Sequence, residues 1–230
     1  SIGAPPELNN QLGQDWGLPP FLPDRLRETA YAAFIRVLRH NMRHAGALRI
    51  DHVMGLMRQY WIPAGCTAAE GAYVQFPFDD LLGILALESQ RNQCLVIGED
   101  LGTVPEEVTA ALPLRGILSY RLLILEKEPG GNFVLPDNYP AHALTAVTTH
   151  DLPTLPGYWA GRDIMQRTAL QLFSSEEARR EQVVGRAQER PYLLLRLEQG
   201  GLLPDGLTVN PVSLPSASPE FIQSVYSYLA

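Results

Sequence analysis

The sequence has few cysteines and no long apolar run. Its two cysteines, Cys66 and Cys94, stand far apart and outside any C-x-x-C pattern, which argues against a zinc site built on paired thiolates and against a disulfide framework. Reduced thiols of this kind are typical of a cytoplasmic protein. The longest apolar runs, around Arg121 to Leu125, are far shorter than the roughly 20 residues that a membrane-spanning helix needs. We therefore expect a cytoplasmic protein with no membrane segment.

Basic residues are also scarce. Lysine and arginine number 18 against 25 aspartate and glutamate residues, which gives a net charge of −7. A nucleic-acid-binding protein needs a basic face to neutralise phosphates, so the charge argues against nucleic acid and favours a neutral or cationic small partner. The first ten residues, SIGAPPELNN, contain no basic stretch followed by an apolar one, and we expect no signal peptide. A hydrophobic content of 46% with 19% charged residues is typical of a globular chain with a buried core.

Glycine and proline, with 19 residues each, gather between periodic segments and predict long ordered loops. The first 23 residues have no hydrophobic period, and we expect them to form a loop. From Asp24 apolar residues recur at helical spacing as far as Gly46. This pattern predicts one helix with Asp24 as its N-cap and Gly46 as its stop.

Short apolar strands then alternate with helices. Four strands are predicted, over residues 47–50, 94–97, 117–125 and 143–149. Helices are expected over residues 80–93, from a capping box at Thr103 and Glu106 to about Gly116, and through most of the chain after Asp163, with starts at Ser174 and Ser218. Nearly wholly apolar strands alternating with helices are typical of a parallel sheet covered on both faces.

The fold class that follows is α/β, as part of a (β/α)₈ barrel. A complete barrel needs eight strands in roughly 250 residues, and four strands cannot close the cylinder. We therefore expect residues 1–230 to be a partial barrel domain and a piece of a larger protein that supplies the remaining strands. Within it, residues 1–23 are the predicted loop beside the site, residues 24–160 the βα units and residues 161–230 a helical segment.

Three of the four predicted strands end in a carboxylate, at Asp51, Glu99 and Asp151. The carboxyl ends of parallel strands meet on one face, where ligands bind in such folds. The interval from Asp51 to Glu99 fits one βα unit with a long loop, and the interval from Glu99 to Asp151 fits two units. Converging acids repel one another, and such a cost is typical of a functional site. We expect these three acids to converge.

Glycosyl transfer is the chemistry that needs two unequal carboxyl groups. One stays ionised and attacks the anomeric carbon, and the other donates a proton to the leaving oxygen. Arg49 lies two residues before Asp51 and on the same side of the strand, so charge pairing should keep Asp51 ionised. Glu99 has no cation beside it in the sequence and follows an apolar strand, which favours a protonated acid.

Four ordered motifs resemble the 4-α-glucanotransferases, the amylomaltases or disproportionating enzymes of glycoside hydrolase family 77. They are GAPPELNNQLGQDWGLPP (3–20), LRIDHVMGLMRQYWIP (48–63), VIGEDLGTVP (96–105) and TTHDLPTLPGYW (148–159). The segment GAYVQFPFDDLLGILALES between them is similar to the bacterial maltodextrin-pathway form. The resemblance covers the chain from Gly3 to about Trp159.

The resemblance implies that Asp51 is the nucleophile, Glu99 the general acid/base and Asp151 a third acid that strains the sugar ring. It implies that Arg49 and His150 donate hydrogen bonds to the substrate. A further set would shape the sugar subsites: Gln14, Asp15, Trp16 and Trp61, with Tyr60 as another ring. The family usually has aspartate at the position of Glu7, so no role is assigned there. The implied partners are maltooligosaccharides or other α-1,4-glucans, and no cofactor is needed because carboxyl groups supply both the nucleophile and the proton transfer.

Several alternatives stay open from sequence. An α-glucan hydrolase would use the same acids with water as acceptor, and a non-catalytic glucan-binding fragment would keep the residues without their geometry. Trp159 fits a core position or a subsite, and the role of His52 is open. His40 and His44 have a zinc-like spacing, but without a third ligand in view a solvated helix face is the better interpretation. Asp100 is interpreted as a structural acid.

Overall fold

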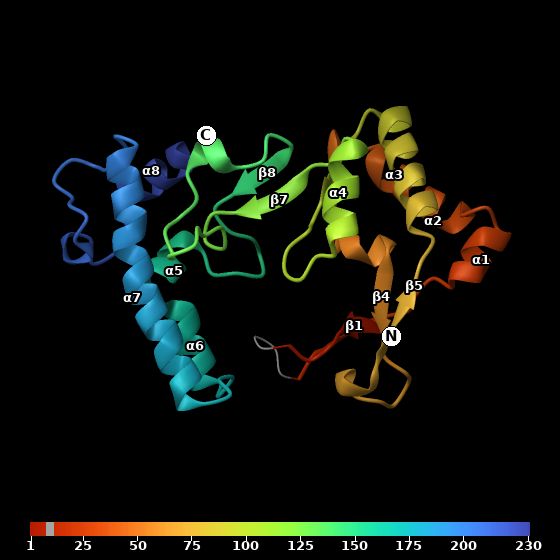
Figure 1. The fold of residues 1–230 in the computed structure, drawn as a ribbon, viewed down its shortest axis with the longest axis horizontal. Coiled ribbons are helices and arrows are strands. Elements are labelled where there is room, and N and C mark those ends of the chain that lie inside the picture. The colour runs from red at the N-terminus through yellow and green to blue at the C-terminus, as the bar shows by residue number, and fades with distance from the viewer. Residues whose placement is uncertain (8–11) are drawn as a thin grey trace. The chain divides into compact units, whose positions relative to one another are not determined.

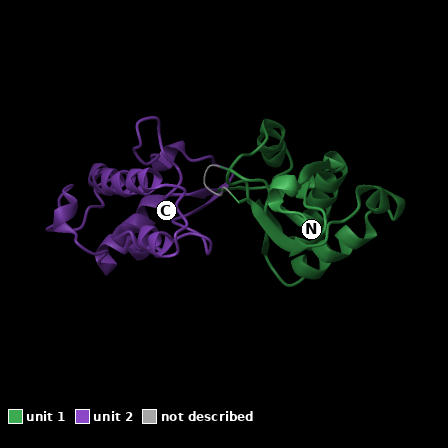
Figure 2. Cartoon of the chain, turned by 90° about the horizontal axis from the view of Figure 1, so that it is seen from below, with its two compact units in different colours: residues 1–120 green, residues 121–230 purple. Residues whose placement is uncertain are grey.

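The structure, a computed structural model, describes residues 1–7 and 12–230 and divides into two compact units. The first unit is Ser1–Tyr120 and the second is Arg121–Ala230, drawn in green and purple in Figure 2. Residues 8–11, which belong to the predicted N-terminal loop and to the first motif, lie outside the described residues. Within the described part of the chain, no helix is both long enough and apolar enough to cross a membrane.

Two parallel strands form the centre of the first unit. β3 (Ala47–Ile50) pairs with β6 (Leu95–Gly98), and the register runs from Ala47 opposite Leu95 to Ile50 opposite Gly98. A parallel bridge joins Ile97 to Leu118, just before β7 (Ser119–Leu122). β3 has its predicted range, β6 lies one residue later than predicted, and β7 covers only the middle of the strand predicted over residues 117–125. The predicted parallel arrangement is confirmed for this part of the sheet.

Helices of the first unit, which are labelled in Figure 1, share an apolar core with these strands. They are α1 (Pro23–Glu28), α2 (Ala32–Met42), α3 (Phe78–Asn92) and α4 (Glu106–Leu114). The fully buried side chains of Leu85 and Val96 belong to this core. Beside it, the buried carboxylate of Glu88 on α3 accepts hydrogen bonds from Arg39 of α2, at 2.6 and 2.8 Å, and from Arg91 at 2.9 Å.

The prediction of one helix from Asp24 to Gly46 is wrong. The chain leaves the helix after Glu28 and re-enters it at Ala32, because Ala30 and Tyr31 adopt positive φ angles of 48° and 58°. The Tyr31 hydroxyl hydrogen-bonds Asp80 in the first turn of α3. Hydrophobic spacing cannot report this break, since the apolar period continues across it.

A second sheet in the first unit was not predicted. β1 (Ile2–Ala4), β2 (Gln14–Leu18), β4 (Arg58–Trp61) and β5 (Ala72–Gln75) form an antiparallel sheet in the order β2-β1-β4-β5. The expectation of a loop over residues 1–23 is therefore wrong at β1 and β2. The prediction of four strands is also wrong, because the described part of the chain contains more strands than that. β2 is exposed throughout its length, so it lacks the alternation of buried and exposed residues by which a strand is recognised.

Helix starts were predicted with mixed success. Ser218 caps α8 (Pro219–Leu229) as expected, with its hydroxyl accepting the Phe221 N–H at 3.2 Å. Ser175, and not Ser174, caps α7 (Glu176–Gln199). α4 begins after Pro105 without a side-chain cap, so the capping box predicted at Thr103 is wrong. Proline at this position already holds the extended conformation that precedes a helix.

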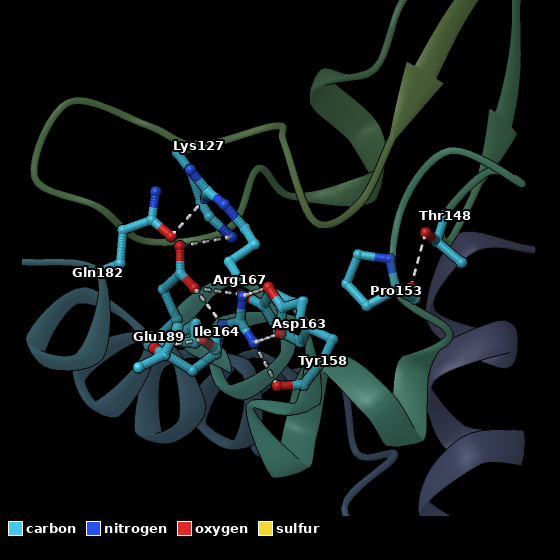
Figure 3. A network of polar contacts seen from close by, with 11 residues as sticks. Lys127, Thr148, Pro153, Tyr158, Asp163, Ile164, Arg167, Gln182 and Glu189 are labelled. Carbon is cyan, nitrogen blue, oxygen red and sulfur yellow. Dashed lines mark hydrogen bonds and ion pairs between the residues drawn. The ribbon is translucent and has the colours of Figure 1, made fainter. Parts of the chain in front are cut away.

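Helices form most of the regular structure of the second unit, and the chain after about Asp163 is helical between its loops, as the sequence predicts. β8 (Ala143–Ala146) forms a two-stranded sheet with β7, and α5 (Leu155–Ala160), α6 (Arg162–Ala169), α7 and α8 follow. Trp159 is buried at the centre of this core, 4.7 Å from the Phe221 ring. A polar network ties α5, α6 and α7 together (Figure 3): Arg186 pairs with Asp163 at 2.9 Å, and the Tyr158 hydroxyl hydrogen-bonds Glu189.

Candidate active site

Asp51 and Glu99 occupy matching positions at one edge of the parallel sheet. Ile50 and Gly98 are partners at the ends of β3 and β6, and each acid is the next residue of its strand. The Glu99 N–H donates to the Ile50 carbonyl at 2.9 Å, which extends the pairing by one residue. Both carboxylates therefore emerge where parallel strands deliver their ligand-binding residues.

Arg49 links these two acids. Its Nη1 lies 2.5 Å from Asp51 Oδ1, and its Nη2 lies 3.9 Å from Glu99 Oε2. The guanidinium carbon also lies 5.5 Å from the centre of the Tyr120 ring, a cation-π arrangement. The predicted pairing of Arg49 with Asp51 is thus present, while the expectation that Glu99 has no cation beside it is wrong. This contact could not be predicted from the sequence, because Arg49 and Glu99 are far apart in the chain and meet only through the pairing of β3 with β6.

The two acids differ strongly in exposure. The Asp51 side chain is 77% exposed, whereas that of Glu99 is 11% exposed. Glu99 accepts the backbone N–H of His52 at Oε2 (2.8 Å) and that of Leu101 at Oε1 (2.7 Å). One acid is open to an incoming ligand, and the other is held by main-chain donors, so the pair is chemically unequal.

His52 lies in the turn between β3 and the short 3-10 helix η1 (Val53–Leu56). Its φ of 47° is in the left-handed region. The imidazole meets the Trp16 ring edge-on with 5.3 Å between ring centres. Burial lowers the pKa of His52, and the carboxylates of Glu99, Asp51 and Glu7 act in the opposite direction.

The predicted subsite residues Gln14, Asp15 and Trp16 form the first three positions of β2. Gln14 Oε1 accepts the Trp16 indole N–H at 2.9 Å, so these two side chains share a face of the strand. Asp15 accepts hydrogen bonds from the Ser1 hydroxyl (2.5 Å) and the Gly17 N–H (2.9 Å), and these bonds lower its pKa. Through the contact of Trp16 with His52, β2 borders the turn that carries Asp51.

The aromatic residues of β4 have other surroundings. Tyr60 is buried, and its hydroxyl donates to the Ala68 carbonyl at 2.8 Å, so the expectation that its ring is offered to a sugar is wrong. Trp61 is partly buried against the core, with its ring 6.2 Å from that of Phe76 and its N–H donating to Gln59 at 3.3 Å. A sugar contact by Trp61 stays a prediction.

Asp151 and His150 belong to the second unit, in the loop after β8. Both side chains are exposed, and His150 Nε2 lies 3.2 Å from Asp151 Oδ2. The loop is bracketed by a hydrogen bond from the Thr148 hydroxyl to the Pro153 carbonyl at 3.0 Å (Figure 3). Convergence of Asp151 with Asp51 and Glu99 stays a prediction, because these acids belong to different units.

Three other interpretations from sequence are settled. Asp100 is a buried acid that accepts the Tyr120 N–H at 2.8 Å, as expected of a structural residue. Trp159 is core, since it is fully buried and its N–H donates to the Leu214 carbonyl at 2.9 Å. His40 and His44 are exposed and both contact Arg43. Within residues 1–7 and 12–230, no group of three or more His, Cys, Asp or Glu side chains could hold a metal ion.

Tyr120 and the backbone of His52 are site features that the sequence did not reveal. Tyr120 lies in the predicted strand adjacent to β6, and a polar ring in an otherwise apolar strand was the available signal. The left-handed turn at His52 had only a weak signal in the sequence, since histidine is enriched in that conformation but seldom adopts it.

Known proteins are similar to this chain in sequence. Residues 1–197 match the profile of the 4-alpha-glucanotransferase family, glycoside hydrolase family 77. The 4-alpha-glucanotransferase of Haemophilus influenzae is 45% identical over 204 residues, which are 89% of this chain and 29% of that protein. The 4-alpha-glucanotransferase of Mycobacterium tuberculosis is 41% identical over 234 aligned residues, covering 100% of this chain and 31% of that protein.

Solved structures agree with these matches. The crystal structure of amylomaltase from Corynebacterium glutamicum superposes with a TM-score of 0.82 at 38% identity, over 91% of this chain and 30% of that one. The amylomaltase of Streptococcus agalactiae in complex with acarbose matches with a TM-score of 0.67 at 18% identity, which supports the fold alone. The chain spans about 30% of the length of these relatives, so the predicted fold class, an incomplete (β/α)₈ barrel, is confirmed.

With its ordered motifs, its paired acids and a family match over residues 1–197, the chain belongs to the 4-α-glucanotransferase family, glycoside hydrolase family 77.

Proposed function

We propose that this chain carries the nucleophile and the acid/base of a 4-α-glucanotransferase that transfers segments of α-1,4-glucans to acceptor glucans. The observation that carries the proposal is the bridge made by Arg49 between Asp51 and Glu99, two acids at matching ends of paired strands. The exposed acid suits a nucleophile, and the enclosed one suits a group that exchanges a proton with the substrate. No cofactor is required by this chemistry.

In the first step a carboxylate oxygen of Asp51 attacks the anomeric carbon of the donor glucan. A carbon–oxygen ester bond forms, and the glycosidic bond breaks with its electron pair going to the leaving oxygen. Glu99, in its protonated form, gives that oxygen its proton. The donor segment is then held covalently on Asp51, and the remainder of the donor leaves as a shortened glucan.

In the second step the acceptor replaces the leaving glucan. Glu99, now a carboxylate, takes the proton of an acceptor hydroxyl, whose oxygen attacks the anomeric carbon. The ester bond to Asp51 breaks with its electron pair returning to the carboxylate, so both acids recover their first state. Two inversions give net retention of the α linkage.

Arg49 contributes by charge in both steps. Its guanidinium lies against both carboxylates, so it can hold Asp51 in place for attack and face Glu99 while Glu99 acts as the base of the second step. Asp151 and His150 are proposed to contact sugar hydroxyls, and Gln14, Asp15, Trp16 and Trp61 to border the subsites. We place this function in the cytoplasm, with support from two free cysteines.

Incubation of the full-length enzyme with maltotriose tests the proposal. A transferase yields maltooligosaccharides longer than the substrate together with glucose and maltose, and these products are separated by chromatography. An α-glucan hydrolase would give only glucose and maltose, and that result would reject transfer while leaving the two acids in place. Absence of any product would support the third alternative, a non-catalytic glucan-binding protein.

A further inference from the structure

The turn that follows the nucleophile has an unusual backbone conformation at His52. Its φ and ψ of 47° and 62° are left-handed, a region that only a few per cent of residues other than glycine occupy, although histidine is enriched among them together with asparagine and aspartate. Backbone strain of this kind persists only where the surroundings enforce it, and it gathers at functional sites. The conformation therefore calls for a structural reason.

Glu99 supplies that reason. The left-handed turn aims the His52 N–H at Glu99 Oε2, at 2.8 Å. The Val53 N–H donates to the Glu99 carbonyl at 2.9 Å, and the Glu99 N–H donates to Ile50 at 2.9 Å. Three hydrogen bonds thus join residues 50–53 to Glu99, and of these the bond from His52 reaches the carboxylate itself.

Packing holds the turn in place. Val53 is fully buried, and a Cβ atom at Gly98 would lie 3.0 Å from its side chain, so the two strand ends approach closely. The His52 carbonyl accepts the Gly55 N–H at 2.8 Å, and its imidazole lies edge-on to Trp16. The chain around His52 is therefore fixed on both sides of the residue.

We propose that His52 is a positioning residue for Glu99: its left-handed backbone directs an N–H to Oε2, and together with the Leu101 N–H on Oε1 this bond fixes the carboxyl group in the orientation from which it exchanges its proton with the glycosidic oxygen. The inference rests on the proposed function, in which Glu99 is the acid/base. It assigns the effect to the main chain of His52, so the imidazole itself takes no part in proton transfer.

Substitutions at His52 separate backbone from side chain. Glycine adopts the left-handed conformation freely and asparagine tolerates it, whereas alanine is strained there and valine, being β-branched, is a strong outlier. The series His52→Gly, His52→Asn, His52→Ala and His52→Val should be made in the full-length enzyme. His40→Val, a matched replacement at an exposed histidine of α2, is the control.

Two substrates distinguish a loss of proton donation by Glu99 from a loss of nucleophilic attack by Asp51. Maltotriose has a poor leaving group that needs a proton, while α-maltosyl fluoride has a good one that hardly does. Because general acid catalysis contributes roughly 10²–10⁴-fold, His52→Val should lower kcat/KM for maltotriose by about tenfold or more and change kcat/KM for fluoride release by less than about threefold, since kcat/KM reports only the first step. His52→Gly and His52→Asn should stay within about threefold of wild type on both substrates.

A loss in His52→Gly as large as that in His52→Val would overturn the proposal, because the imidazole and not the backbone would then matter. An equal loss on both substrates in His52→Val would overturn it too. If His52→Val does not fold, as judged by its Tm, the comparison of His52→Ala with His52→Gly decides in the same way. Glu99→Gln provides the separate check: full activity of that variant on maltotriose would reject the proposed function itself.

Discussion

Arg49 Nη1 lies 2.5 Å from Asp51 Oδ1; Arg49 belongs to β3, and Asp51 is the residue that directly follows the end of this strand. Side chains two apart in a strand share a face, so the strand itself sets this pair. The second nitrogen of the guanidinium is left to face Glu99 at 3.9 Å. One cation therefore stands between the proposed nucleophile and the proposed acid/base.

The planar shape of the guanidinium matters for this bridge. Lysine has one charged nitrogen and cannot address two carboxylates in the same fork geometry. Arg49→Lys should lower kcat/KM for maltotriose by roughly 10- to 100-fold, measured by product chromatography. Arg180→Lys, at an exposed arginine of α7, should have no effect, and an Arg49→Lys enzyme with wild-type kcat/KM would show that the bridge is dispensable.

Asp51→Asn removes the proposed nucleophile with little change of shape. An amide cannot form the glycosyl ester, so transfer should fall by more than about a thousandfold with an unchanged Tm. The measurement is transfer from maltotriose by the full-length enzyme, with Asp24→Asn, an exposed acid in the first turn of α1, as control. Rates near wild type in Asp51→Asn would exclude the nucleophile assignment.

Substitution of Trp159 tests whether this residue belongs to the hydrophobic core or to a sugar subsite. In Trp159→Phe the Leu214 carbonyl loses its donor, and a buried carbonyl without a partner costs about 1–3 kcal/mol. We expect urea unfolding of the 230-residue chain to show that loss. Trp16→Phe, at an exposed tryptophan, should change the free energy of unfolding by less than about 0.5 kcal/mol, and the same small change in Trp159→Phe would contradict the core assignment.

Glu88 should make the stability of the chain depend on pH. Hydrogen bonds from Arg39 lower its pKa in the folded state from the ordinary value of 4.5. The unfolded chain then binds the proton more readily, so the stabilisation is complete above the ordinary pKa and is lost as the pH falls through the lowered one. Glu88→Gln should cost about 1 kcal/mol at pH 7, because the arginines are half exposed and partly screened by solvent.

The measurement is the free energy of unfolding of wild type and Glu88→Gln between pH 3 and pH 7. The difference between the two should shrink toward the acid end. A difference that is constant, or that grows as the pH falls, would show that the Glu88 charge does not stabilise the fold. Glu177→Gln, on the solvated face of α7, should match wild type within about 0.5 kcal/mol at pH 7.

The 230-residue chain alone should be a poor catalyst. It spans about 30% of its relatives, and a barrel active site is built from the ends of many strands. We expect its turnover of maltotriose to be at least about 100-fold below that of the full-length enzyme. Equal rates for the two proteins, compared at equal molar concentration, would contradict this expectation.

The sequence by itself determined the parallel strands and the acids at their ends. Residues 47–50 and 94–97 are short apolar runs bounded by glycine or polar residues, and strands β3 and β6 lie there within one residue. Asp51 and Glu99 could be predicted to lie at the strand ends, because a charged residue marks the point where a buried apolar run stops. The pairing of Arg49 with Asp51 was also predictable, since strand geometry fixes which neighbours share a face.

Only the tertiary structure decided the features that depend on contacts between segments far apart in the sequence. β1 and β4 pair across about 60 residues of chain, the exposed β2 has no pattern of its own, and Arg49 meets Glu99 only because β3 and β6 pair. The positive φ angles at Tyr31 and His52 follow from packing and hydrogen bonds. Local periodicity reports which face of a segment is buried, and it contains no information about which other segment, or which main-chain donor, lies against that face.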